Sequence, residues 1–207
     1  MNQLSTSTKR PPTERGQRTR QHLLDAAEAV FGEMPFEHAS ISEITRRAGV
    51  ALGTFYVYFP HKQAIFVELV DELGTRLRQA LGAAISKATT RLEKERAGFR
   101  AFFEFAGTHR NLYRVVRQAE FVDEAAYHRY YRTLGNAYAN GLKDAMDRGE
   151  IGRFDPEIVA FALMGMADMI GMRFVLWENP QKLDAIVDEV VELMTHGLLS
   201  PKRMPGQ

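Results

Sequence analysis

The fold of this 207-residue chain is decided by one stretch, Ile41–Lys62, which has the sequence ISEITRRAGVALGTFYVYFPHK. Two short helical patterns flank a break centred on Gly49, and the second pattern is crowded with a threonine, two tyrosines and a phenylalanine. This order is typical of a helix-turn-helix, in which one helix braces, a tight turn reverses the chain, and a second helix offers side chains to DNA. We therefore expect the chain to bind duplex DNA.

Outside this stretch the pattern is also helical, because apolar residues recur at three- and four-residue spacing and strand-like alternation is nowhere sustained. We expect an all-α fold of about nine helices, in which an N-terminal three-helix module with the helix-turn-helix precedes a C-terminal helical bundle. The expected helices cover about 13–34, 40–49, 52–58, 60–88, 92–108, 111–120, 123–148, 156–177 and a last stretch ending near 198.

Four regions follow from this pattern. We expect a disordered basic arm over 1–12, a DNA-binding domain over 13–60, a ligand-binding and dimerisation domain over 61–200, and a flexible tail over 201–207. The first 20 residues carry five lysines and arginines against one glutamate, a net charge of 5 − 1 = +4 in a chain of net charge +1. A basic arm on a near-neutral body suits phosphate contact, although the same charge also fits a solvated tail.

The composition excludes several classes of protein. The chain has no cysteine, which removes disulfides, thiolate metal sites and cysteine nucleophiles. It has no phosphate loop, no metal-ligand spacing and no Gly-x-Ser-x-Gly turn, so we expect no enzyme, no catalytic residue, no metal and no cofactor. We find no signal peptide and no apolar run long enough to span a bilayer, so we expect a cytoplasmic protein with no membrane partner.

The stretch strongly resembles the TetR family of transcriptional repressors, and the resemblance covers about residues 15–73. It includes the first-helix pattern LLDAAEAVF and a Gly-x-x-Tyr-x-x-Phe core, here Gly53, Tyr56 and Phe59. The resemblance implies a homodimer that places the third helix of each copy in successive major grooves of a near-palindromic operator. The candidate DNA-contacting residues are Arg18, Ser42, Arg46, Arg47, Gly53, Thr54, Tyr56, Tyr58 and Lys62.

Two positions depart from the family pattern. Ala51 and Leu52 stand where the family often has a small hydroxyl residue and a polar or charged one, so few polar side chains remain to contact bases. Much of the affinity should then come from phosphates and the basic arm. The tyrosines could instead join an aromatic core, but packing both Tyr56 and Tyr58 inward would need two faces of one short helix. We expect Phe55 and Phe59 to take the core positions.

The segment Phe161–Trp177 is apolar on most faces, so it must be buried on most sides. Together with the last helix it could pair with its copy in a four-helix dimer interface, as the TetR resemblance implies, or it could form an ordinary monomer core. We favour the dimer, because a single short recognition helix needs a partner half-site for useful affinity.

The middle helices are rich in aromatic residues with a few polar groups among them, a composition typical of a small-molecule site. Three arginines share one helical stripe, which is either a solvated face or an anion-binding rim for an acyl-coenzyme A. Asp168 and Arg173 lie inside the apolar segment 161–177, where burying a charge is costly unless the residue forms an ion pair or binds a ligand. The candidate ligand-binding residues are Phe102, Phe103, Phe105, Arg110, Arg114, Arg117, Tyr127, Tyr131, Asp168 and Arg173.

These features favour a ligand-responsive transcriptional repressor, released from a double-stranded operator by a small amphipathic or aromatic effector. The fourth helix continues from the DNA-binding module into the bundle, so we expect it to transmit a conformational change from one to the other. A ligand-independent architectural DNA-binding protein and a transcriptional activator are the alternatives.

Overall fold

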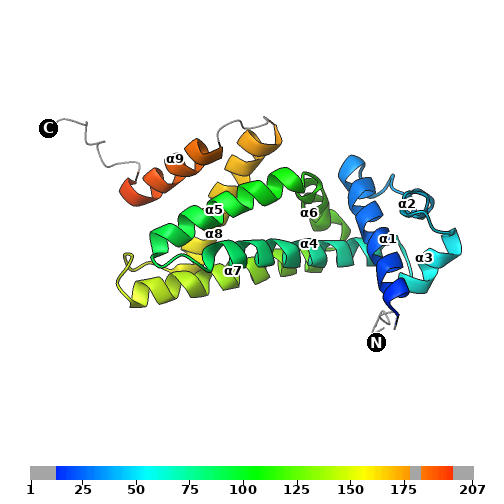
Figure 1. Cartoon of the computed structure of the whole chain (residues 1–207), viewed down its shortest axis with the longest axis horizontal. Helices are drawn as coiled ribbons and strands as arrows, with labels where there is room; N and C mark the ends of the chain where they lie inside the picture. The colour runs from blue at the N-terminus through cyan, green and yellow to red at the C-terminus, as the bar shows by residue number, and fades with distance from the viewer. Residues whose placement is uncertain (1–12, 178–182, 198–207) are drawn as a thin grey trace. The chain divides into compact units, whose positions relative to one another are not determined.

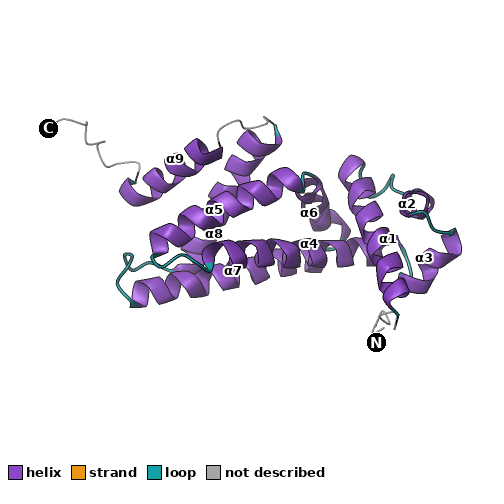
Figure 2. Ribbon diagram, in the orientation of Figure 1, coloured by secondary structure: helices purple, strands orange, loops and turns teal. Residues whose placement is uncertain are grey.

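The computed structural model describes residues 13–177 and 183–197, and every regular element in these ranges is a helix (Figures 1 and 2). The prediction of an all-α fold is confirmed. The expected basic arm and C-terminal tail lie outside the described residues. The elements are α1 (Glu14–Glu33), α2 (Ile41–Ala48), α3 (Leu52–Tyr58), α4 (Lys62–Ile85), α5 (Arg91–Thr108), α6 (Asn111–Val122), α7 (Glu124–Asp147), α8 (Pro156–Ile170), the π-helical η1 (Gly171–Leu176) and α9 (Leu183–His196).

Several helices begin at side chains that accept hydrogen bonds from the first turn. The Thr13 hydroxyl accepts from the Gly16 amide at 3.2 Å, and the Ser40 hydroxyl accepts from the Glu43 amide at 3.1 Å. The Asp155 carboxylate accepts from two amides at the start of α8, at 2.9 and 3.1 Å. Because the first amides of a helix have no partner inside it, these caps set where each helix starts.

Helix α8 does not continue unchanged to residue 177, as we expected it to do. At Gly171 the chain widens into a π-helical turn, in which the Trp177 amide donates to the Met172 carbonyl at 3.2 Å, five residues back. Gly171 and Val175 are buried there, and a Cβ atom on Gly107 of α5 would lie 3.4 Å from the Val175 side chain. The π-helical segment therefore packs closely against α5.

The described chain divides into two compact units. One contains the described residues up to Thr75 together with His109–Thr133, and the other contains Arg76–Thr108 and the described residues from Leu134 onward. Helices α4 and α7 contribute to both units. Helix α6 thus packs with the helix-turn-helix module. The boundary between the two compact units therefore differs from the boundary between DNA-binding and ligand-binding domains that we expect after residue 60.

In the first unit, the core is built where α1 packs against α2 and α6. Three phenylalanine rings form its centre: Phe31 lies 5.7 Å from Phe36 and 5.0 Å from Phe66 between ring centroids, and Phe36 lies 5.3 Å from Phe66. Leu23, Leu24 and the ring of Phe31 are fully buried. Burial of this apolar surface is the main term that holds the module together.

The second unit contains a buried polar network between α5 and α7. The Arg91 guanidinium donates to Glu95 at 2.6 Å, the Tyr138 hydroxyl donates to the same carboxylate, and the Arg91 amide donates to Glu150 at 2.7 Å. Burial, with the Glu95 carboxylate beside it, raises the pKa of Tyr138 far above its ordinary range. Because each of these groups has a partner, the charges can be buried without a large penalty.

Residues Pro156–Leu176, which form α8 and η1, are 21 residues long and apolar enough to cross a membrane by length and composition. Our expectation that no run is long enough was therefore wrong. Asp168 and Arg173 interrupt the run, and a charged side chain in hydrocarbon is costly. The run also keeps an exposed apolar surface, which comprises Ile158, Phe161, Met169 and Phe174.

We predict opposite effects for alanine at two glycines. Gly49→Ala places a side chain at a φ of 68°, where no neighbouring atom clashes but the backbone is left-handed, and it should lower the free energy of unfolding by about 1–2 kcal/mol. Gly82→Ala, in open space on α4, should raise it by about 0.5–1 kcal/mol. Urea denaturation of both variants checks this. Equal effects of the two substitutions would contradict the role of the turn.

Candidate functional site

The turn between α2 and α3 has the geometry expected at Gly49, which adopts a left-handed conformation. The Gly49 amide donates to the Arg46 carbonyl at 3.3 Å, and the Val50 amide donates to the Thr45 carbonyl at 3.0 Å. These bonds close α2 in the manner that favours glycine at this position. Because only residues 49–51 separate the two helices, this turn sets the direction of α3.

The inner face of α3 is fixed by two phenylalanines. Phe55 is fully buried and Phe59 is nearly so, and their ring centroids lie 5.6 Å apart. The Arg20 guanidinium of α1 lies over the Phe59 ring at 5.4 Å. Ile44 of α2 is also fully buried. The prediction that both phenylalanines are core residues is confirmed.

The outer face of α3 is exposed, and α2 and α3 lie together on one flank of α1 (Figure 1). Tyr56 is 56% exposed, and Gly53 is exposed beside it. Thr54 and Tyr58 are half-buried at the edges of this face. The structure therefore places Tyr56 where a phenol can reach DNA, whereas Tyr58 and Thr54 would contact it only from the side.

The two arginines of α2 are held by carboxylates. Arg46 donates to Glu43 at 2.8 and 2.6 Å, while Arg47 donates to Glu43 at 2.7 Å and to both oxygens of Glu33 on α1 at 2.7 Å. Hydrogen bonds from Arg46 and Arg47 lower the pKa of Glu43 to about 2. A DNA phosphate would therefore compete with Glu43 for these guanidinium groups.

Lys62 has a structural role that we did not expect. Its ammonium donates to the carbonyls of Phe36 at 2.5 Å and Ala39 at 2.8 Å, and it lies 4.3 Å from the centroid of the Phe36 ring. It thereby supports the loop between α1 and α2. The expected DNA contact of Lys62 stays a prediction, in which a phosphate would compete with these carbonyls.

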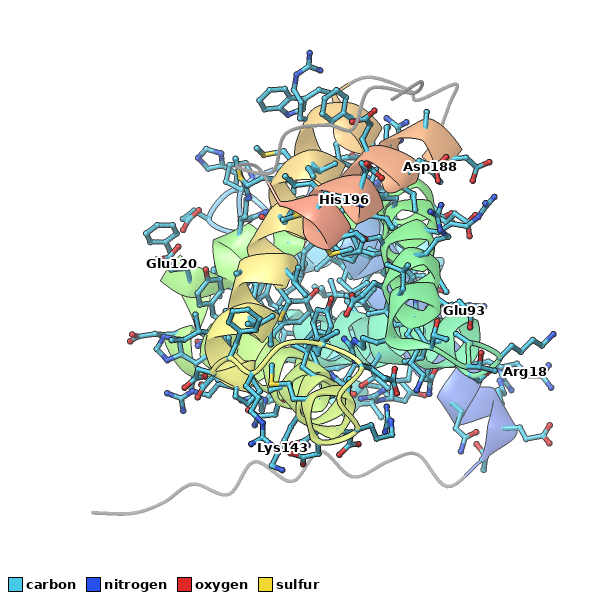
Figure 3. The ribbon with its side chains drawn as sticks, turned by 90° about the vertical axis from the view of Figure 1, so that its left-hand side faces the viewer. Arg18, Glu93, Glu120, Lys143, Asp188 and His196 are labelled. Atoms are coloured by element: carbon cyan, nitrogen blue, oxygen red, sulfur yellow. The ribbon has the colours of Figure 1, made fainter. Side chains whose placement is uncertain are left out.

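Arg18 and Ser42 remain candidates for phosphate contact. Arg18 is exposed on the first turns of α1 and pairs with Glu14 at 3.3 Å, a surface contact of small energy (Figure 3). Ser42 is exposed in the first turn of α2. Both side chains can reach a ligand without breaking a buried interaction.

The ten candidate ligand-binding residues divide equally between the two units. The first unit holds Arg110, Arg114, Arg117, Tyr127 and Tyr131, and the second holds Phe102, Phe103, Phe105, Asp168 and Arg173. On α5, the Phe103 ring is buried and its centroid lies 6.0 Å from those of Phe99 and Phe102. The Arg173 guanidinium lies over the Phe174 ring at 5.0 Å. The phenylalanines of α5 thus pack against one another, and their role in ligand binding stays a prediction.

The arginine stripe on α6 is not uniform. The Arg114 guanidinium donates to the Gly32 carbonyl near the end of α1 at 2.8 Å, although Arg114 is exposed, as are Arg110 and Arg117. Arg114 therefore also supports the end of α1. The three arginines stay candidates for an anion-binding rim.

Sequence reasoning missed the residue that most firmly joins α6 to the DNA-binding module. The Gln118 amide group donates to the Phe31 carbonyl at 2.8 Å, and its oxygen accepts from the Phe36 amide at 2.6 Å. Asn111, at the start of α6, packs so closely on Gly32 that a Cβ atom there would lie 2.1 Å from its Cγ. A lone glutamine on an amphipathic helix gives no signal of such a contact.

The structural role of Lys62 predicts a loss of stability on substitution. Lys62→Met keeps most of the side-chain length but removes the donor of the Ala39 carbonyl and the shorter of two hydrogen bonds to the Phe36 carbonyl, and it should lower the free energy of unfolding by about 1–3 kcal/mol. Lys143→Met, which removes an exposed ion pair with Asp147, is the control and should change stability little. Unchanged stability of Lys62→Met would contradict the structural role of Lys62.

Comparison with known proteins gives the module a family. Residues 23–69 match the family described as bacterial regulatory proteins, tetR family. The chain is 28% identical over 196 residues to the uncharacterized HTH-type transcriptional regulator YdgC of Bacillus subtilis (strain 168), covering 89% of this chain and 95% of that one. It is 27% identical over 188 residues to the HTH-type transcriptional regulator EthR of Mycobacterium tuberculosis (strain ATCC 25618 / H37Rv), covering 87% of each.

Solved structures share the fold. The transcriptional regulator FadR from Bacillus subtilis in complex with stearoyl-CoA matches with a TM-score of 0.76 and 24% sequence identity, over 86% of this chain and 98% of that chain. These similar proteins are transcriptional regulators, which confirms our expectation of a regulator and not an enzyme. In its N-terminal module the chain therefore matches the tetR family of bacterial regulatory proteins, and over most of its length it is similar to helix-turn-helix transcriptional regulators.

Proposed function

We propose that this protein is a cytoplasmic repressor that binds a near-palindromic operator as a homodimer and leaves it when a small amphipathic effector binds. The observation that carries the proposal is the exposed outer face of α3, held by a closed turn and two buried phenylalanines in a TetR-family chain. A short helix presented in this way suits the major groove of B-DNA.

The exposed apolar surface of α8 and η1 supports the homodimer. Ile158, Phe161 and Met169 would be costly to leave in water as a continuous patch, and a second copy of the same patch can cover them by two-fold symmetry. Helix α9 is held beside α5 by two ion pairs, from Arg96 to Asp188 and from Arg100 to Asp184 (Figure 3). This leaves Leu193 of α9 exposed to join the same interface.

A long-chain acyl-coenzyme A is the effector class that we propose. FadR from Bacillus subtilis, which shares the fold, binds stearoyl-CoA. In this chain, the aromatic side chains of α5 suit an acyl chain.

Helix α6 offers a direct route from effector to DNA. One side of α6 carries Arg117 and also holds the end of α1 through Arg114 and Gln118. An effector that moves α6 would therefore move α1, on which α2 packs. Release requires that the effector bind the two arrangements with different affinities, since binding alone shifts nothing.

The DNA interface predicts a loss of operator affinity in Tyr56→Phe. We expect the operator affinity to fall roughly tenfold for the hydroxyl lost from each subunit. The substitution removes a hydrogen bond to a charged phosphate and leaves the exposed ring in place. Fluorescence anisotropy with a duplex enriched from a random pool measures this. Tyr127→Phe, outside the helix-turn-helix, is the control and should bind as the unchanged protein does. Equal affinity of Tyr56→Phe would remove Tyr56 from the interface.

The coupling route predicts that Gln118→Ala keeps effector binding but loses effector response. Isothermal titration with stearoyl-CoA should give similar affinity for Gln118→Ala and the unchanged protein, because Gln118 holds α1 and not the ligand. Stearoyl-CoA should then weaken operator binding much less in Gln118→Ala. Gln79→Ala, exposed on α4, is the control. A full response in Gln118→Ala contradicts the route, and absence of stearoyl-CoA binding to the unchanged protein contradicts the effector class.

A further inference from the structure

The outer face of α3 is almost entirely apolar. Val57 is 72% exposed and Leu52 is 49% exposed, and they flank Tyr56. Leu52 and Tyr56 are four residues apart, as are Gly53 and Val57, so these residues share one side of the helix. Besides the Tyr56 phenol, only the half-buried Thr54 and Tyr58 at the edges of this face carry a side-chain hydrogen-bonding group.

This orientation is imposed by the core. Val57 is two residues from both Phe55 and Phe59 and so lies opposite these rings, and hiding it would expose them and break the turn at Gly49. Leu52 is exposed as the first residue of α3. The aliphatic side chains therefore stay outward on the helix that, by our proposed function, enters the major groove.

In the major groove, the exposed edges of guanine, adenine and cytosine offer hydrogen-bonding groups, and thymine adds the apolar C5 methyl group. An aliphatic side chain that packs on a hydrogen-bonding base edge displaces water from that edge and forms no hydrogen bond in its place. When it packs on a methyl group, apolar surface of both the protein and the base is buried. We propose that Leu52 and Val57 determine operator specificity by packing on pyrimidine C5 methyl groups, so that each half-site carries thymine opposite them. This inference rests on the proposed DNA binding and names the bases that α3 selects.

The test removes single methyl groups from the DNA. The full-length protein first enriches a duplex from a random pool, and each thymine of that duplex is then replaced singly by deoxyuridine, which pairs identically but lacks the C5 methyl. At one or two positions in each half-site, we expect the replacement to weaken binding roughly fourfold, the worth of one buried methyl group. Placing cytosine at such a position should weaken binding further, and 5-methylcytosine should recover part of the loss.

Variants assign each methyl group to its side chain. In Val57→Ala or Leu52→Ala, the loss of affinity caused by deoxyuridine should vanish at one position of each half-site and persist at the others. Both variants should fold, because the two side chains are exposed. Leu92→Ala on α5, where the leucine is 48% exposed, is the matched control and should keep every deoxyuridine effect.

The outcomes separate this inference from the proposed function. If the protein binds the enriched duplex but deoxyuridine has no effect at any thymine, or if its effects persist in Val57→Ala and Leu52→Ala alike, methyl recognition by these residues is wrong while DNA binding stands. If no duplex is enriched from the pool, the proposed function is wrong and the inference is wrong with it.

Discussion

The burial of Phe55 and Phe59 is the interaction on which the DNA-binding module depends. Helix α3 has seven residues, too few to be stable alone in water, so its order comes from these two side chains and from the closed turn at Gly49. The same burial decides which residues face outward. Val57 is exposed because the opposite side of the helix packs in the core.

Several of the cations that we expect at DNA have partners within the protein. Of the cations expected at DNA, Arg46 and Arg47 are bound by Glu43, and Lys62 supports the loop before α2. A carboxylate whose pKa is lowered to about 2 stays ionised at neutral pH and keeps competing with phosphate. The exposed aliphatic face of α3 then becomes the part of the described interface with the most freedom to select bases.

Local features of the fold were predictable from sequence, and contacts between distant residues were not. The bounds of α3 and the start of α8 after Asp155 follow from glycine, proline and capping side chains, whose effects are local. The hydrogen bonds of Lys62 and Arg114 were not predicted, because their acceptors are backbone carbonyls 26 and 82 residues away, which no side-chain pattern reveals. The π-helical turn at Gly171 also left no sign in the apolar periodicity.

The central claim is that two copies of α3 enter two major grooves on one side of the operator. Dimethyl sulfate methylates guanine N7 in the major groove and adenine N3 in the minor groove, so it separates the two sides of each base pair. On the enriched duplex we predict two clusters of protected major-groove positions, with centres about 34 Å, one helical turn, apart. Protection confined to minor-groove adenines, or a single major-groove cluster, would contradict the claim.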